Sequence, residues 1–235
     1  MTKADAELAT RLADMARDLL AQTSVDKTLD RIVAHAVKLV DGCQDSGVLV
    51  IEGGRRVRTL AANSDLVHTS DAVQEEVGEG PCFDAARYAH EVYRIEDVTR
   101  EEERWARYVP RARELGIGSI MGFCLYTEDD NLGALNMYSP HPGAFTERSE
   151  HIGWLLASHA AVAFSSARSH AQLETAMASR HDIGAAMGIL MERYSIPAQQ
   201  AFTVLKESSQ TQNVKLRDIA RTVAETGEIP GAVDR

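Results

Sequence analysis

The sequence has few cysteines and no long apolar run, and each shortage excludes a class of protein. Its three cysteines, Cys43, Cys82 and Cys124, are odd in number and form no Cys-x-x-Cys pair. We therefore expect free thiols in a reducing compartment rather than a disulfide framework. No run approaches the roughly 18 apolar residues that cross a bilayer. The first twenty residues carry mixed charges, unlike a signal peptide. These absences predict a cytoplasmic protein with no membrane partner.

Excess positive charge is also absent. The net charge is −10, which disfavours indiscriminate binding to nucleic acid, and no sequence-specific DNA binding is expected. Residues 1–169 hold 18 Lys and Arg against 27 Asp and Glu, whereas residues 170–235 hold 7 against 8. Any binding to a polyanion should therefore be local to the C-terminal part. The eight histidines form no metal-ligand cluster, and no catalytic constellation is evident.

The first 146 residues alternate between helical and strand patterns. Apolar positions recur at helical spacing over 4–21 and again after Ser24, a candidate N-cap. A polar helical region covers about 69–90 with a break at 78–86, and another helix surrounds Trp105. Strands are expected at 47–51, 56–62, 92–95, 118–127 and 132–139, largely as hairpins. This order predicts an α+β fold, an antiparallel sheet with helices packed on it.

A long helical pattern begins after Thr146, a candidate N-cap, and meets no proline until Pro197. Thirteen positions follow alternating steps of three and four, which indicates a coiled-coil-like heptad seam. They are Ile152, Leu155, His159, Val162, Ser166, Ser169, Leu173, Ala176, Arg180, Ile183, Met187, Leu190 and Tyr194. The alternative is two amphipathic helices joined at a polar hinge near 165–170.

Two short helices are expected after Tyr194. Ser195 is a candidate N-cap for the first and Asn213 for the second, which ends at Gly227. Gly184 and Gly188 lie one turn apart inside the preceding helix, where each costs roughly 1 kcal/mol relative to Ala. Missing side chains let another surface approach. We expect that surface to be a neighbouring helix, with an RNA backbone as the alternative.

The stretch 180-RHDIGAAMGILMERYSIPAQQAFTVLKESSQTQNVKLRDIARTV-223 resembles the ANTAR domain, a three-helix RNA-binding module of bacterial antitermination regulators. Upstream, 78-GEGPCFDAA-86, 97-DVTREEERWARYV-109, 115-LGIGSIMGFCL-125 and 132-LGALNMYSPHPGAFT-146 resemble the GAF domain commonly fused to it. We therefore expect an N-terminal helix at 1–23, a GAF sensor-like domain at 24–165, an ANTAR bundle at 166–228 that shares the connecting helix, and a tail at 229–235.

The ANTAR resemblance implies a dimer, or paired units, that binds two RNA hairpins with hexanucleotide loops. Met187 departs from the pattern, because many relatives have Lys there, and one expected RNA contact is lost. Small polar side chains and cations suit an unstacked RNA loop. The candidate RNA-binding residues are Arg180, Gly184, Met187, Gly188, Arg193, Ser208, Ser209, Asn213, Lys215 and Arg217. The alternatives are a solvated face for Lys215 and Arg217, capping alone for Asn213, pairing of Arg193 with Glu192 or Glu207, and a core position for Met187.

The GAF resemblance implies an unknown small-molecule signal bound near 69–90 and 97–116, and no cofactor is evident. Cys82 follows a proline at an expected helix start, so Cys82 and Cys124 are redox or ligand candidates against the alternative of buried structural thiols. The leading hypothesis is a non-catalytic, homodimeric regulator. The alternatives are a dimerising scaffold that has lost RNA binding and a thiol oxidoreductase, because one GAF branch reduces free methionine sulfoxide.

Overall fold

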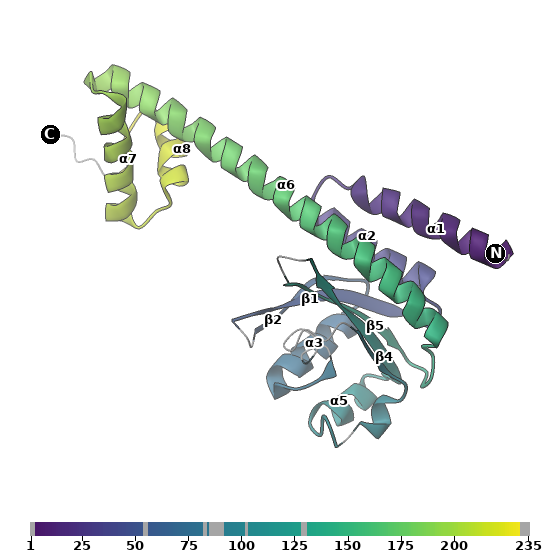
Figure 1. Cartoon of the computed structure of the whole chain (residues 1–235). Coiled ribbons are helices and arrows are strands. Elements are labelled where there is room, and N and C mark those ends of the chain that lie inside the picture. Colours follow the sequence, from purple (N-terminus) through teal and green to yellow (C-terminus); the bar gives the residue numbers. More distant parts are fainter. Residues whose placement is uncertain are drawn as a thin grey trace. The chain divides into compact units, whose positions relative to one another are not determined.

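A computed structural model describes residues 3–53, 56–81, 84, 92–101, 103–127 and 131–230. The chain divides into two compact units, Met1–Arg168 and Ser169–Arg235, and one helix, α6 (Glu147–Tyr194), contributes to both (Figure 1). The first unit contains a five-stranded sheet and its helices, and the second is a bundle of helices. The expected α+β class is confirmed.

The sheet of the first unit is antiparallel and has the strand order β2-β1-β5-β4-β3. Strands β1 (Asp45–Glu52) and β2 (Arg56–Ala62) form the first hairpin, and β4 (Ser119–Tyr126) and β5 (Asn131–Ser139) form the second. Pairing of β1 with β5 joins the hairpins, and β3 (Val92–Ile95) borders β4. All five strands lie where the alternating and apolar patterns predict them.

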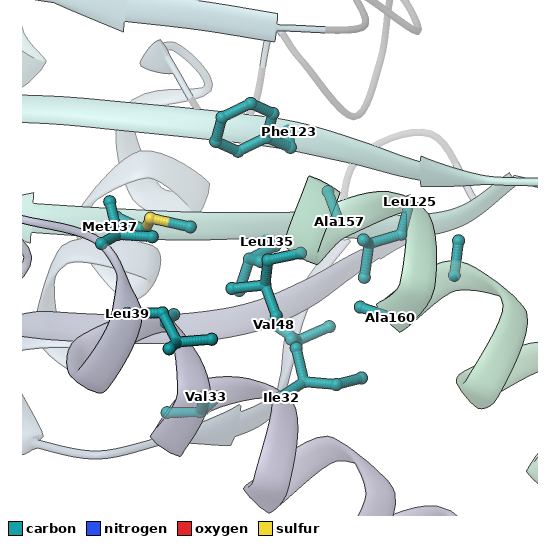
Figure 2. Packing of buried hydrophobic residues seen from close by; sticks show 14 of the residues in the cluster. Ile32, Val33, Leu39, Val48, Phe123, Leu125, Leu135, Met137, Ala157 and Ala160 are labelled. Atoms are coloured by element: carbon teal, nitrogen blue, oxygen red, sulfur yellow. The ribbon is translucent and has the colours of Figure 1, made fainter. Parts of the chain in front are cut away.

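One face of this sheet packs against helices from both ends of the unit. Helix α1 (Lys3–Leu20) packs on α2 (Val25–Leu39), which begins at Ser24, whose Oγ accepts a hydrogen bond from the Lys27 amide at 3.3 Å. The resulting core joins apolar side chains of α1, α2, β1, β2, β4, β5 and the first part of α6, and Figure 2 shows part of it. It includes Ile32, Val33, Leu39, Val48, Phe123, Leu125, Leu135, Met137, Ala157 and Ala160.

The other face of the sheet is covered by shorter helices. Helix α3 (Asp65–Val77) packs on β2 and β1 and against α5 (Tyr108–Glu114), and a 3₁₀ turn, η1 (Val98–Arg100), contacts α5 (Figure 1). Strand periodicity separates the two faces, because successive side chains alternate. On β5, Leu135 and Met137 lie in the core with α2 and α6, whereas Ala134 and Tyr138 lie in the core with α3 and α5.

Helix α6 is continuous over its 48 residues, so the single-helix prediction is confirmed and the hinged alternative is wrong. The amide of Ser149 donates to Thr146 Oγ1 at 3.3 Å, which is the predicted N-cap. The expected seam is only partly available to a partner. Ile152 is buried against the sheet, and Leu190 is buried in the C-terminal unit. The seam positions from Leu155 to Arg180 are exposed.

The second unit packs the C-terminal part of α6 with α7 (Ala198–Gln212) and α8 (Leu216–Thr226). Seven buried side chains form its core: Ala186, Leu190, Ala201, Leu205, Ile219, Ala220 and Val223. Two expected caps are wrong. Ser195 has a φ of 51° and lies before the helix, which begins after Pro197, the observed N-cap. A residue at that left-handed φ lacks the extended backbone that N-capping requires. The other, Asn213, lies at the C-terminal end of α7 instead.

Glycines in α6 provide a matched test of close packing. A Cβ at Gly153 would lie 2.5 Å from Cε2 and Cζ of the buried Phe123 ring, whereas a Cβ at Gly184 would have no described atom within 4 Å. Gly153→Ala should therefore lower the free energy of unfolding by about 1–2 kcal/mol, because overpacking outweighs helix propensity. Gly184→Ala should raise the stability of the second unit by up to about 1 kcal/mol.

Both tryptophans, Trp105 and Trp154, belong to the first unit. Denaturant unfolding followed by tryptophan fluorescence therefore measures the effect of Gly153→Ala, and thermal unfolding followed by far-UV circular dichroism measures that of Gly184→Ala. Stability changes of the same sign in both variants would contradict the assigned packing.

Candidate functional site

The cations of the C-terminal unit differ in their exposure and in whether they form ion pairs. Arg180 on α6, Lys206 on α7 and Lys215 at the start of α8 are exposed, and none forms an ion pair with a residue that the structure describes. Arg217 is half-buried, with its Nε 3.7 Å from Asp218. Lys206 was missed in the sequence, because it lies on the solvent side of α7 in no recognisable motif.

Four of the predicted RNA-binding residues lie in or beside the turn between α7 and α8, and the side chains of the two serines bond to carbonyls of the same unit. Asn213 ends α7 in the left-handed conformation, at φ 53° and ψ 38°, and Lys215 is the N-cap residue of α8. The expected N-cap role of Asn213 is therefore wrong, because Asn tolerates this conformation and often ends helices. Ser209 Oγ donates to the Val214 carbonyl at 2.6 Å. Ser208 Oγ donates to the Pro230 carbonyl at 3.0 Å.

Arg193 has a structural partner. Its Nη1 donates a hydrogen bond to the carbonyl of Gly227, the residue at which α8 ends. The guanidinium thus ties the end of α6 to the end of α8, and a cation at a helix C-terminus is favourable. The expected alternative partners, Glu192 and Glu207, are not the ones observed. The geometry favours a role in folding for Arg193.

The two unusual glycines of α6 face open space. Gly184 and Gly188 are exposed, and a Cβ at either would meet no described atom within 4 Å. The expectation that a neighbouring helix of this chain approaches them is therefore wrong. Met187 is half-buried and packs against the bundle core, which supports its core assignment. On an ideal helix Gly184 lies one turn beyond Arg180, so a bare backbone surface adjoins an exposed cation.

In the first unit, two segments that lie far apart in the sequence are joined by hydrogen bonds. Oε1 of Glu79 accepts hydrogen bonds from the backbone amides of Arg107 and Tyr108, the latter at 3.0 Å, and so caps α5. Asp84 Oδ2 accepts from Trp105 Nε1 at 3.0 Å. The described parts of the segments 78–86 and 97–109 are therefore joined by hydrogen bonds. Cys82, a redox or ligand candidate, lies outside the described residues.

Polar groups also lie beneath α3. Asp71, 2% exposed, accepts hydrogen bonds from the hydroxyls of Thr59 at 2.7 Å and Tyr138 at 3.4 Å. Burial has the largest effect on the pKa of Asp71 and raises it to about 7, although both hydroxyl donors act to lower it. On the same sheet face, the Tyr93 hydroxyl donates to Asn136 Oδ1 at 2.8 Å. Single-sequence patterns do not find such residues, because their partners come from distant strands.

Comparison with protein families decides the identity of both units. The model of the GAF domain matches residues 22–165, and that of the ANTAR domain matches residues 171–223. This chain is a GAF–ANTAR protein. The architecture supports a regulatory role, because the ANTAR domain is an RNA-binding antitermination module. No curated protein sequence matches the chain.

Solved structures share the fold of the GAF domain. The GAF domain of an Acinetobacter phosphoenolpyruvate-protein phosphotransferase is 14% identical with a TM-score of 0.51, covering 72% of this chain and 97% of that one. Free methionine-R-sulfoxide reductase from Neisseria meningitidis is 15% identical with a TM-score of 0.53, at 72% and 95% coverage. The photosensory core module of Stigmatella aurantiaca phytochrome is 9% identical with a TM-score of 0.61, at 89% and 46% coverage. These identities establish the fold alone.

Depressions in the described surface of the GAF domain include the following two. A small cleft of about 180 Å³ lies between β4 and α6 and is lined by Phe123, Cys124, Tyr126, Trp154, Ala157, Ser158 and Ala161. An open depression of about 530 Å³ includes Asp97, Arg100 and Glu101, within one of the segments expected to bind a ligand. Its charges are of both signs, and Arg94 in it pairs with Glu150 at 3.3 Å. Neither depression identifies a ligand class.

The two described cysteines of the GAF domain are both buried. Burial raises the pKa of the Cys43 thiol to about 12, and the nearby carboxylate of Asp45 adds to the increase. Cys43 is therefore protonated at neutral pH. Cys124 Sγ lies 3.8 Å from Asn131 Oδ1 beside the cleft between β4 and α6. Among the described residues, no helix combines the length and apolar character needed to cross a membrane.

The left-handed backbone at Asn213 predicts different mutational effects for a residue that ends α7 than for an N-cap residue of α8. Asn213→Gly should leave the stability of the ANTAR domain unchanged or slightly higher, because Gly adopts this conformation without a Cβ penalty. Asn213→Ser should lower it by about 1 kcal/mol. Thermal unfolding followed by circular dichroism measures both variants. An N-cap residue would give the opposite order, with Ser tolerated better than Gly.

Proposed function

We propose that this GAF–ANTAR protein is a non-catalytic regulator whose ANTAR domain binds paired hexaloop hairpins in nascent RNA, under control of the GAF domain. The observation that carries the proposal is the set of exposed cations on an RNA-binding module within an otherwise acidic chain. Arg180, Lys206 and Lys215 have no ion-pair partner among the described residues, so their charges are available to phosphates.

Because the ANTAR domain carries little net charge, we expect tight RNA binding to need two linked binding sites. Residues 170–235 carry 7 Lys and Arg against 8 Asp and Glu, so long-range attraction to RNA is slight. Each cation that neutralises a phosphate contributes only about 0.7–0.9 to the salt slope. Two linked sites raise affinity without further contacts, because the second binding event becomes intramolecular. A dimer on two adjacent hairpins meets this requirement.

The exposed part of α6 supports dimerisation. Leu155, Val162, Leu173 and Met177 are between 47% and 71% exposed. Their spacings of 7, 11 and 4 residues place them along one side of the helix, the periodicity of a coiled-coil seam. An apolar stripe with this period fits a second copy of the same helix. We propose that α6 pairs with α6 of another chain along it.

The RNA proposal predicts a selective loss of affinity in one variant. The wild-type protein should bind an RNA with two adjacent hexaloop hairpins more tightly than either hairpin alone. Lys206→Ala with Lys215→Ala should weaken binding by about tenfold near 0.1 M salt and flatten the salt dependence, because two phosphate contacts are lost. Gel-shift titration at several salt concentrations measures both effects.

A matched control removes the same charge elsewhere. Lys27→Ala with Arg100→Ala takes two exposed cations from the GAF domain and should leave RNA affinity unchanged. Equal binding to one and two hairpins would contradict the bivalent mode. Absence of RNA binding under all conditions would favour the scaffold alternative.

The dimer proposal predicts dissociation when charge enters the stripe. Leu173→Glu with Met177→Glu should convert the protein to a monomer in sedimentation experiments, because four like charges would meet in an apolar seam. Gln172→Glu with Thr175→Glu adds the same charge to another side of α6 and should leave the dimer intact. A monomeric wild type would contradict the proposal, as would dissociation of both variants.

The non-catalytic part of the proposal rests on thiol chemistry. Disulfide exchange needs an accessible thiolate, whereas Cys43 and Cys124 are buried and the Cys43 pKa is raised by burial. Turnover of free methionine sulfoxide with a thiol reductant would contradict it.

A further inference from the structure

Helix α3 is fixed to the GAF domain through two consecutive buried residues. Ser70 Oγ lies 2.9 Å from the Tyr108 hydroxyl of α5. The next residue, Asp71, receives hydrogen bonds from Thr59 on β2 and Tyr138 on β5. Asp71 therefore joins α3 to strands near both sides of β1, and the strength of this attachment depends on the state of one carboxyl group.

Among the described residues, the groups that hydrogen-bond to Asp71 are hydroxyls, and no cation pairs with it. Thr59 faces it from β2, Tyr138 from β5, and Tyr108 is reached through Ser70 from α5. On α3 itself, His68 is exposed, Glu75 is half-buried, and Glu76 pairs with Arg111 at 3.5 Å. No described Lys, Arg or His forms an ion pair with Asp71. A buried carboxylate without a cation is costly, whereas the neutral acid fits a cluster of hydroxyls that both donate and accept.

We propose that Asp71 makes the GAF domain a proton sensor: the neutral acid holds α3 on the sheet, and ionisation of this group loosens α3. The input is thus a change of pH in the neutral range. The proposal names a signal for the proposed regulator and rests on that function only for its output. Sensing itself depends on the buried cluster of Asp71, Thr59 and Tyr138.

The direction of the pH effect follows from proton linkage. The pKa of Asp71 is raised to about 7 by burial, from an ordinary value of 3.8. Between these two values the folded chain holds a proton that the unfolded chain releases, so raising the pH favours unfolding. The stability that this proton contributes to the folded chain is fully present at acid pH. It decreases as the pH rises toward 7 and is lost above pH 7. One proton difference changes the unfolding constant about tenfold per pH unit.

The test compares Asp71→Asn with the wild-type full-length protein. Unfolding constants from tryptophan fluorescence in denaturant are measured from pH 5 to pH 8. Asn keeps the shape and cannot ionise, so the stability of Asp71→Asn relative to wild type should rise at least tenfold across this range. Glu76→Gln, which removes an exposed carboxyl of the same helix, should leave the wild-type profile unchanged. Carbon-13 NMR of the wild-type carboxyl groups should show one Asp that titrates near neutral pH, absent from the variant.

Three results would overturn the proposal. They are a wild-type Asp71 that titrates below pH 5, parallel profiles of wild type and Asp71→Asn, and an equal effect of Glu76→Gln. The NMR titration uses the wild type, so it decides even if Asp71→Asn fails to fold. These measurements need no RNA, and loss of RNA binding would overturn the proposed function without affecting them.

Discussion

The close contact of α6 with the sheet is the constraint on which the rest of the GAF domain depends. Gly153 leaves space for the ring of Phe123, and Ala157, Ala160 and Ala161 continue this small-residue side of the helix. Larger side chains would lift α6 off the strands and expose Leu135 and Met137, which share its core. Ile152, Leu156 and Phe164 of α6 are buried in the same core. Leu155 and Val162, on the other side of the helix, are exposed to solvent, and this is the side that the proposed dimer would bury.

The two faces of the sheet are chemically different. The face under α2 and α6 is lined by aliphatic side chains and Phe123, and it needs no hydrogen-bond partners. On the face under α3 and α5, Tyr93 of the sheet donates to Asn136, and Thr59 and Tyr138 of the sheet donate hydrogen bonds to Asp71 of α3. Dispersion and hydrophobic burial vary little with pH, whereas a buried carboxyl responds to it directly. The polar face is the one whose stability a chemical signal can alter.

Local patterns were sufficient for the elements and insufficient for the contacts between them. The strands, the caps at Ser24 and Thr146 and the continuity of α6 follow from periodicity and short-range hydrogen bonding, and they were predicted correctly. Asn213 was assigned to the wrong helix end, because Asn suits both an N-cap and a left-handed C-terminus. The glycines show the limit most clearly. Gly153 and Gly184 have the same helical context in sequence, yet only Gly153 meets another side chain.

The same limit applies to the candidate site residues, whose identity is easier to predict from sequence than their contacts. Several cations of the ANTAR domain, although not Lys206, were identified from sequence, but which of them are available to RNA could not be. Arg193 is bonded to the end of α8, whereas Lys215 has no ion-pair partner among the described residues. Asp71 and Glu79 were not identified at all, since a carboxylate becomes unusual only through what surrounds it. Their partners lie 12 to 67 residues away along the chain, beyond the reach of any motif.

Strand β5 gives the buried acid a physical route to α6. Tyr138 bonds to Asp71 on one face of the sheet, and its neighbour Met137 packs in the core with Ala157 and Ala160 on the other. Adjacent residues of a strand cannot shift independently, because their amides are fixed in the β1 and β4 ladders. Loosening of α3 therefore acts on the same strand that supports α6. Contact alone does not establish coupling, which is a free energy between two sites. In the proposed regulator that free energy would be measured as the dependence of RNA affinity on the charge of Asp71.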